Sequence, residues 1–527
     1  MENQQKETFV GFCRRHRLPI AAAFMLMLLA FGYMLTRYSL TIDEELFLQG
    51  PPTPLFWLTQ GRFGIYVLNL LISPDGRFVP ILWDWLATIV WFLSAVVMLF
   101  AFRPYFPNLR KFEVFVFLAY CSVLPFSVGE ILSYSMSNLQ ICVAMLCTAV
   151  ACLLSAKHKR IPQKGLLVAA ALLLYFSVSV YETFASVYIT WVAATALLDF
   201  LLRKKPFREV MRGVAPLAVL CAAAVVAYGI TRFLIGRYVV PSDGYVTGNY
   251  VGWSKESSVW KALFLALANV ARVSFGLTIY GYEVYGGVAL CATACAFCAA
   301  VLYCAVQMRK KGERLLTFAM AVCAVCAPFV IFIALGAYNA HGRSLLALPV
   351  LGAAQWLFVL RVLRGKGIER WAAVAAALVL AYNAAQTHLL YVDAQKVYEY
   401  NRATVRAIAE ACEQKGYLLQ EKPVVFVGMY DSSGGEKLRK TGACGGSHFT
   451  WDDGVNERLV SFFRAEGVPV RGASPRQIAE ALPTALALPA WPDPGSVQDA
   501  GDCIVVHLSE PTEKWRQLHL PSDRRAP

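Results

Sequence analysis

The stretch RRHRLPIAAAFMLMLLAFGYMLTRYSLTIDEELFLQG (residues 14–50) joins a basic patch, an apolar run and three consecutive acids. The apolar run, from Ile20 to Leu35, is long enough for one membrane span. The basic patch before it is expected to stay in the cytoplasm, because positive charge accumulates in cytoplasmic segments. No small-residue cleavage site follows the run. The stretch therefore predicts an uncleaved signal anchor with the acids on the outer side.

Similar apolar runs recur along the chain, so the sequence predicts a polytopic α-helical membrane protein. Of its 527 residues, 57% are hydrophobic and only 16% are charged, whereas soluble domains carry about 25% charged residues. The net charge of +14 fits basic cytoplasmic loops better than nucleic-acid binding. About 11 transmembrane helices are expected, at residues 18–36, 79–102, 113–129, 138–156, 165–181, 184–202, 213–235, 284–308, 315–337, 344–361 and 371–388.

Basic loops alternate with loops of mixed composition. The basic set is short and begins at Arg103, Lys157, Arg203, Arg309 and Arg361. Every second loop belongs to this set, which together with the basic amino terminus places these loops in the cytoplasm. The other loops then face outward, which in a bacterium is the periplasm.

Two of the outer loops contain helical patterns of their own. GRFGIYVLNLLI (61–72) has helical periodicity, and SVWKALFLALANVARVSFGL (258–277) is amphipathic. Both segments predict helices that lie in the plane of the membrane interface.

The chain changes in composition after residue 388, which divides it into a transmembrane domain (1–388) and a small periplasmic α/β domain (389–527). PVVFVGM (423–429) and DCIVVHLS (502–509) predict buried strands of this domain. A Cys444–Cys503 disulfide would be allowed after export, and the sequence leaves it open. No GxGxxG, Walker lysine, CxxC…CxxC or HExxH pattern occurs, so neither a cofactor nor a zinc site is expected.

The three acids are the first candidate site residues, and they are expected at the outer edge of the membrane. Asp43, Glu44 and Glu45 follow the first span by about seven residues, and ionisable residues at such a depth usually face a cavity or a partner. A carboxylate suits a general base, so Asp43 or Glu44 is expected to act as the catalytic base. Two adjacent acids could also bind a divalent cation, although this pattern is nonspecific.

Further polar residues lie at comparable depth in the other outer loops. Arg62 and Arg343 suit a phosphate group, because a guanidinium donates two parallel hydrogen bonds. Glu182 and His341 are expected beside them, together with Glu45, as substrate-binding residues, and Glu130 is a weaker candidate. For each residue a structural role stays open: Arg62 could reach lipid headgroups, His341 could make a structural hydrogen bond, and Glu182 could cap a helical hairpin. As a set they predict an enzyme that acts on a lipid-phosphate sugar.

Several of these segments resemble the glucosyltransferase II family of serotype-converting O-antigen glucosyltransferases. The most specific block is SLTIDEELFL (39–48) with WLTQGRFGIYVLNLLI (57–72). Weaker similarities cover the stretches SYSMSNLQICVAMLCTAVACLL (133–154), VYETFASVYITWVAATAL (180–197), YNAHGRSLLALPVL (338–351) and the region from Gln386 through Tyr391 and Asp393 to Asn401. The family usually shows Asp-Asp-Glu where this chain has Asp43-Glu44-Glu45, which leaves open which acid is the base.

The resemblance implies a GT-C-like membrane glycosyltransferase. Such enzymes transfer a sugar, in this family usually glucose, from a polyprenyl-phosphate donor to a glycan acceptor such as O-antigen, on the periplasmic face of the inner membrane. The resemblance also implies that the acidic cluster is the functional site and that the reaction inverts the anomeric carbon. The partners expected are the lipid-linked donor, the glycan and membrane lipid, without nucleic acid.

Two other classes of function compete with this interpretation. A transporter or flippase of lipid-linked sugars should carry internal repeats and polar residues at the middle of the membrane. No clear repeat is present, and the polar residues gather at one edge, which favours an enzyme. A membrane anchor for the outer domain is the third reading, and it would leave the acids without a purpose.

Overall fold

The computed structural model describes residues 7–48, 50–244, 248, 251–253, 258–278, 283–336 and 341–520. Its contacts divide the chain into two compact units. Unit 1 comprises Met1–Thr36, Thr53–Asp75 and Ile81–Leu389, and unit 2 comprises Arg37–Pro52, Gly76–Pro80 and Leu390–Pro527. The loop with the three acids thus belongs to unit 2, whereas the sequence places residues 1–388 in a single domain.

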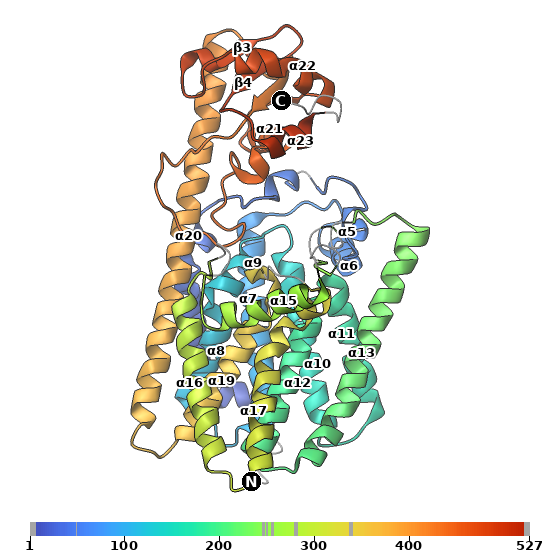
Figure 1. Ribbon diagram of the computed structural model, residues 1–527, viewed down its shortest axis with the longest axis vertical. Coiled ribbons are helices and arrows are strands. Elements are labelled where there is room, and N and C mark those ends of the chain that lie inside the picture. The colour runs from blue at the N-terminus through green and yellow to red at the C-terminus, as the bar shows by residue number, and fades with distance from the viewer. Residues whose placement is uncertain are drawn as a thin grey trace. The chain divides into compact units, whose positions relative to one another are not determined.

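Unit 1 is a bundle of helices (Figure 1). In the described part of the chain, eight helical segments are long and apolar enough to cross a membrane. These segments are α7 (Pro80–Phe102), α8 (Lys111–Val123) with α9 (Glu130–Leu132), α10 (Asn138–His158), α12 (Phe184–Leu201), α13 (Phe207–Tyr238), α16 (Gly287–Val306), α17 (Lys311–Cys326) with α18 (Val330–Leu335), and α20 (Glu369–Gln414). They make the chain a membrane protein.

Shorter helices complete the bundle. Four of them are apolar: α3 (Arg17–Ala30), α6 (Phe63–Ile72), α11 (Lys164–Val180) and α19 (Leu348–Leu363). The others in the described part are α2 (Phe9–Arg15), α4 (Gly32–Thr36), α5 (Phe56–Thr59) and α15 (Val259–Ser274). Helices α3, α11 and α19 coincide with three of the predicted spans but are shorter than the eight segments that are long enough to cross a membrane, so the count of eleven stays a prediction.

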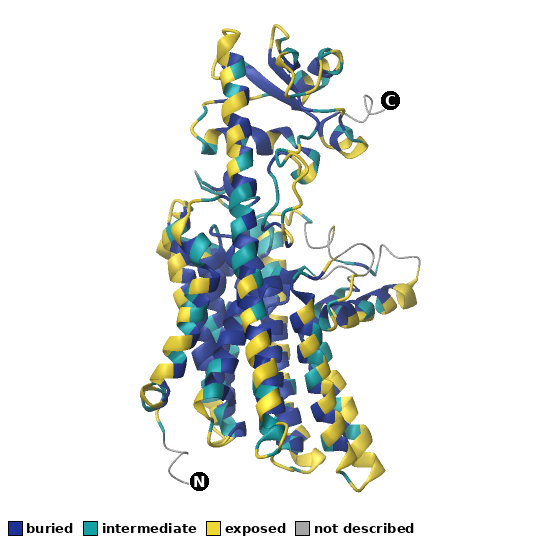
Figure 2. Cartoon of the chain, turned by 90° about the vertical axis from the view of Figure 1, so that its left-hand side faces the viewer, coloured by how far each residue is buried: buried dark blue, intermediate teal, exposed yellow. Residues whose placement is uncertain are grey.

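Burial separates the inner helices of unit 1 from the outer ones. The apolar windows of the α8–α9 segment and of α12 are 94% and 89% buried, against 28% for α13. Exposed residues on the outer helices are nevertheless apolar, for example Val226 and Phe233 on α13 and Val322 on α17. Figure 2 shows buried residues gathered inside the bundle and exposed ones on the outward faces. Apolar side chains on an outward face are what contact with lipid requires.

Helix α15 has two faces of different character. Trp260 and Phe264 are exposed, whereas Asn269 and Arg272 are buried in unit 1. An apolar face left exposed beside a bundle of spans fits the interfacial helix that the sequence predicts.

The sheet of unit 2 is mostly parallel. Its described strands follow the order β2 (Arg471–Gly472), β1 (Pro423–Val427), β4 (Ile504–His507), β3 (Val497–Asp499). Strand β1 is parallel to β2 and β4, and β3 is antiparallel to β4. Strands β1 and β4 form at the two apolar runs that the sequence predicts. Every residue in both is buried, as expected for parallel strands that are covered on both faces.

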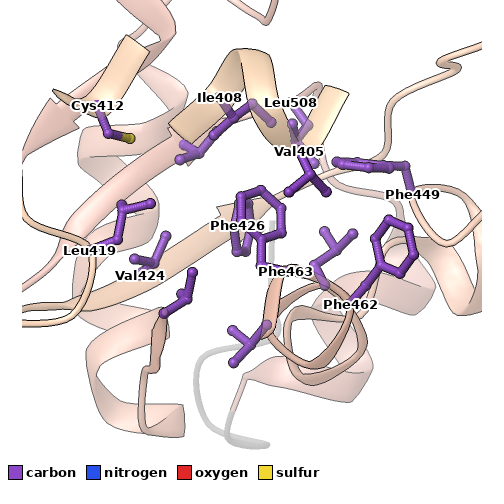
Figure 3. Packing of buried hydrophobic residues seen from close by; sticks show 14 of the residues in the cluster. Val405, Ile408, Cys412, Leu419, Val424, Phe426, Phe449, Phe462, Phe463 and Leu508 are labelled. Carbon is purple, nitrogen blue, oxygen red and sulfur yellow. The ribbon is translucent and has the colours of Figure 1, made fainter. Parts of the chain in front are cut away.

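Helices cover both faces of this sheet. One core joins Phe426 of β1 to Phe462 and Phe463 of α21 (Asn456–Ala465) and to Val405 of α20 (Figure 3). The other core joins β1 and β4 to α22 (Pro475–Leu486) and α23 (Glu513–His519). Helix α20 itself is one continuous helix of 46 residues, so it continues well past the end of the predicted span 371–388. Cys503 is a free thiol, so the Cys444–Cys503 bridge is not formed.

Candidate active site

The acids of the first loop are held in a tight turn of unit 2. Asp43 has a φ of 82°, a left-handed conformation that aspartate adopts more readily than most residues. It leads into a 3-10 turn, η1 (Glu44–Leu46), which packs on helix α21. The Glu44 carboxylate accepts a hydrogen bond of 2.8 Å from the backbone N–H of Thr41 and is fully buried. Glu44 therefore closes the turn in which it lies.

The guanidinium of Arg458, on α21, binds the other two acids of the cluster. Its Nη2 lies 2.9 Å from Asp43 Oδ1 and 2.9 Å from Asp452 Oδ2, and its Nη1 donates a hydrogen bond to Glu45. His448 Nε2 lies 3.3 Å from Glu45 Oε2, and the His448 ring stacks on Phe462. One cation thus neutralises carboxylates from two distant parts of the sequence.

The three acids differ in how far solvent can reach them. The Glu45 side chain is fully buried, whereas 37% of the Asp43 side chain is exposed. Burial acts to raise the pKa of Glu45, but the charges of His448 and Arg458 outweigh it and hold this pKa below its usual range. Glu45 is consequently a fixed anion and a poor proton acceptor. Asp43 is the member of the cluster best placed to meet a substrate.

In unit 1 the two predicted phosphate-binding arginines belong to one connected network. Arg62, just before α6, lies over the ring of Tyr181, with 5.1 Å between its Cζ and the ring centroid. The Tyr181 hydroxyl is 2.6 Å from Ser344 Oγ, and Ser344 directly follows Arg343. Tyr181 and Ser344 therefore link Arg62 to the turn that carries Arg343, although the two arginines are far apart in the sequence.

Arg343 is fixed by a buried acid. Its backbone N–H donates to Glu130 Oε2 at 3.1 Å, and its Nη1 is 3.6 Å from Glu130 Oε1. The guanidinium also lies over the ring of Tyr134 and donates to its hydroxyl. A Cβ on the preceding residue, Gly342, would lie 1.7 Å from the carbonyl oxygen of Phe126. Glycine at 342 thus allows the close approach that sets Arg343 against Glu130.

His341 lies in a positive electrostatic environment. Burial lowers its pKa, and the charges of Arg343 and Arg272 lower it further, to about 4. His341 is therefore neutral at neutral pH and serves as a hydrogen-bonding group, not as a charged one. The two guanidinium charges that contribute to this lowering would attract an anion. Residues 337–340 of the surrounding motif lie outside the described part of the chain.

Glu182 belongs to a neighbouring group. It accepts a hydrogen bond of 2.8 Å from the Tyr228 hydroxyl and lies 3.6 Å from Arg232 Nη1, both on α13. Because Glu182 directly follows Tyr181, it adjoins the arginine network, but its carboxylate points to α13.

Several residues of these groups were not singled out from the sequence. Arg458 and His448 are buried, but no sequence motif distinguishes them from the other charged residues and histidines of the carboxyl-terminal segment. Asp84, on α7, is 4% exposed and accepts hydrogen bonds from Ser135 Oγ (2.8 Å) and Asn138 Nδ2 (2.7 Å). An acid inside an apolar helix is a recognisable signal in the sequence. Through these bonds Asp84 fixes the segment that follows Tyr134.

No group of three or more histidine, cysteine, aspartate or glutamate side chains that could hold a metal ion occurs among the residues described.

A family model described as Glucosyl transferase GtrII matches residues 32–360 of the chain. The matched range contains all the candidate residues named from the sequence, from Asp43 to Arg343, and ends before Arg458. No curated protein matches the chain.

Proposed function

The chain belongs to the glucosyl transferase GtrII family, and we propose that it transfers glucose from a polyprenyl-phosphate donor to a cell-surface glycan such as O-antigen. The proposed reaction takes place on the periplasmic face of the bacterial inner membrane. The transferase activity is inferred from family membership. The helical bundle with its apolar outer faces fits a substrate that has a long lipid chain. Family membership also favours a transferase over a transporter of lipid-linked sugars.

The arginine network is the observation that supports a phosphate-linked donor. Arg62 and Arg343 are joined through Tyr181 and Ser344, and the same surroundings lower the pKa of His341. In the proposed reaction the two guanidinium groups bind the donor phosphate and stabilise the charge it gains as the leaving group. Glu130 and Tyr134 hold Arg343 in its orientation before the donor arrives.

Asp43 is the proposed general base. It takes the proton of an acceptor hydroxyl while the hydroxyl oxygen attacks the anomeric carbon of the donor sugar. The bond between that carbon and the phosphate oxygen breaks, and the electron pair leaves with the polyprenyl phosphate. A single displacement of this kind inverts the anomeric configuration. Glu45 and Arg458 orient Asp43, and Glu44 shapes its turn.

Purified full-length chain provides the direct test. It is incubated in detergent with polyprenyl-phosphate glucose and an isolated glycan acceptor, and mass spectrometry follows both products. The proposal expects a hexose added to the glycan together with free polyprenyl phosphate. A nucleotide sugar as the preferred donor, with no use of the lipid-linked sugar, would contradict it.

A further inference from the structure

A polar cavity of about 820 Å³ lies in unit 1, at the opposite end of helix α12 from Glu182. It is lined by the junction of α2 and α3, the loop after α7, the end of α10, the end of α12 and the start of α13. Helix α12 begins next to Glu182 and ends near Asp199, which lines the cavity. Eighteen helical residues span about 27 Å, so this cavity is separate from the arginine network.

The lining of this cavity is strongly basic. Seven lysines and arginines face three carboxylates there: Arg15, Arg103, Lys159, Arg160, Arg203, Lys205 and Arg212 against Glu7, Asp199 and Glu209. His16, which is 6% exposed, also lines it, and its Nδ1 has no hydrogen-bond partner within the described residues. The cavity thus offers an excess of positive charge and an unused polar atom.

Ion pairs account for only part of this charge. Arg15 and Arg103 pair with Glu7, Arg203 and Lys159 with Asp199, and Lys205 with Glu209. Arg160 and Arg212 form no ion pair with any residue that the structure describes, and both are exposed. Two guanidinium groups are consequently available to an anion in the cavity.

The surroundings of the cavity favour a lipid over a small ion. A volume of about 820 Å³ suits an organic ligand and far exceeds one inorganic phosphate. Arg212 and Pro216, which line the cavity, belong to α13, whose next turns expose Val219, Val226 and Phe233. An apolar surface thus begins where the basic lining ends. The basic loops involved are those that the sequence assigns to one leaflet.

We propose that this cavity binds the phosphate-bearing headgroup of an anionic phospholipid, with Arg160 and Arg212 as its phosphate ligands and the exposed face of α13 beside its acyl chains. Basic pockets between transmembrane helices commonly bind anionic headgroups in this way. The site is independent of the proposed transfer reaction.

Native mass spectrometry of the full-length chain in detergent tests the proposal, with phosphatidylglycerol and phosphatidylcholine as probes. The wild type should retain phosphatidylglycerol in preference to phosphatidylcholine. Each basic residue near an anionic lipid contributes roughly fivefold to binding, so the double variant Arg160→Gln/Arg212→Gln should bind phosphatidylglycerol about thirtyfold more weakly. The matched control is Arg309→Gln/Lys311→Gln, which removes the same charge from a basic loop outside the cavity, and it should bind within about twofold of the wild type.

Three results would overturn the proposal. Equal loss of lipid in the two double variants would show a general effect of surface charge. Equal retention of the two lipids would show that the headgroup charge is not recognised. Displacement of the lipid by millimolar inorganic phosphate would show a site for a small anion.

Discussion

At the scale of the residue, the acids of the first loop illustrate how surroundings separate similar side chains. Glu44 is buried and closes its own turn, Glu45 is locked between Arg458 and His448, and Asp43 keeps an exposed carboxylate. Three neighbouring carboxylates therefore suit three different tasks. Only the exposed one can exchange its contact with Arg458 for a contact with a substrate.

Asp43→Asn should reduce sugar transfer by about 10²–10⁴-fold, because it removes a general base while keeping the shape of the side chain. Glu44→Gln should retain most activity, because its amide oxygen can still accept the hydrogen bond from Thr41. Transfer is measured with the purified variants, and protein level serves as the control for folding. The reverse pattern would make Glu44 the base.

The lowered pKa of Glu45 predicts how the thermal stability of the chain depends on pH in the acid range. Because its pKa is lowered in the folded chain, Glu45 contributes stability above its unfolded pKa of about 4.3, and this contribution is lost as the pH falls through the lower folded value. Glu45→Gln should therefore lower the thermal midpoint at pH 7, and the difference from the wild type should shrink below about pH 4. The exposed Glu421→Gln serves as the control and should show no such pH-dependent difference. A difference that stays constant with pH would contradict the ion-pair argument.

The stacking of Arg62 on Tyr181 leads to a third prediction. Arg62→Lys keeps the charge but loses the planar fork, so the KM for the lipid-linked donor should rise about tenfold, in line with one lost charge-assisted hydrogen bond. Tyr181→Phe keeps the ring under Arg62 and removes only the hydroxyl bonded to Ser344, so its effect should be smaller. Unchanged donor kinetics in Arg62→Lys would indicate that Arg62 contacts bulk lipid instead.

At the scale of the element, short turns position the arginine network. The turn η5 (Gly342–Ser344) packs against η3 (Pro125–Gly129). This contact requires glycine at position 342, because a Cβ there would clash with η3. The helices around these turns could be predicted from the sequence, because a membrane demands long apolar runs. The contacts between the turns could not be predicted, since hydrophobic periodicity does not reveal which turn packs against which.

Gly342→Ala should separate η5 from η3, because its Cβ would lie 1.7 Å from the Phe126 carbonyl oxygen and 2.7 Å from Glu130 Oε2. Overpacking of this kind typically costs about 1–3 kcal/mol, and the loss of the Arg343–Glu130 contact should also impair donor binding. Thermal unfolding and the donor KM are the measurements. Gly367→Ala is the control, since a Cβ there would meet nothing within 4 Å. Equal behaviour of the two variants would contradict the role given to Gly342.

At the scale of the whole molecule, the sequence predicts helices, strands and candidate polar residues better than it predicts which residues contact one another. Strands β1 and β4 of unit 2 follow from local apolar runs, and the candidate arginines were named from their places in loops between predicted spans. The ion pair between Glu45 and Arg458 joins residues 413 positions apart, and no local pattern connects them. The boundary between the two units lies within helix α20. It could not be located from helix ends, because the same helix continues from an apolar sequence into a charged one.

The last prediction concerns the orientation of the chain in the membrane, which follows from the positive-inside rule. The membrane side assigned to each of the two proposed sites depends on it. Cysteines introduced at the exposed positions Lys310 and Lys437 should lie on opposite sides of the membrane. In intact cells stripped of the outer membrane, an impermeant maleimide should label Lys437→Cys at once and Lys310→Cys only after the inner membrane is permeabilised. The parent chain is the control for its own exposed thiols, which lie on the apolar helices α16 and α17 and should react little outside water. Labelling in the opposite order would invert the topology, move the proposed transfer reaction to the cytoplasmic face and place the basic cavity in the outer leaflet.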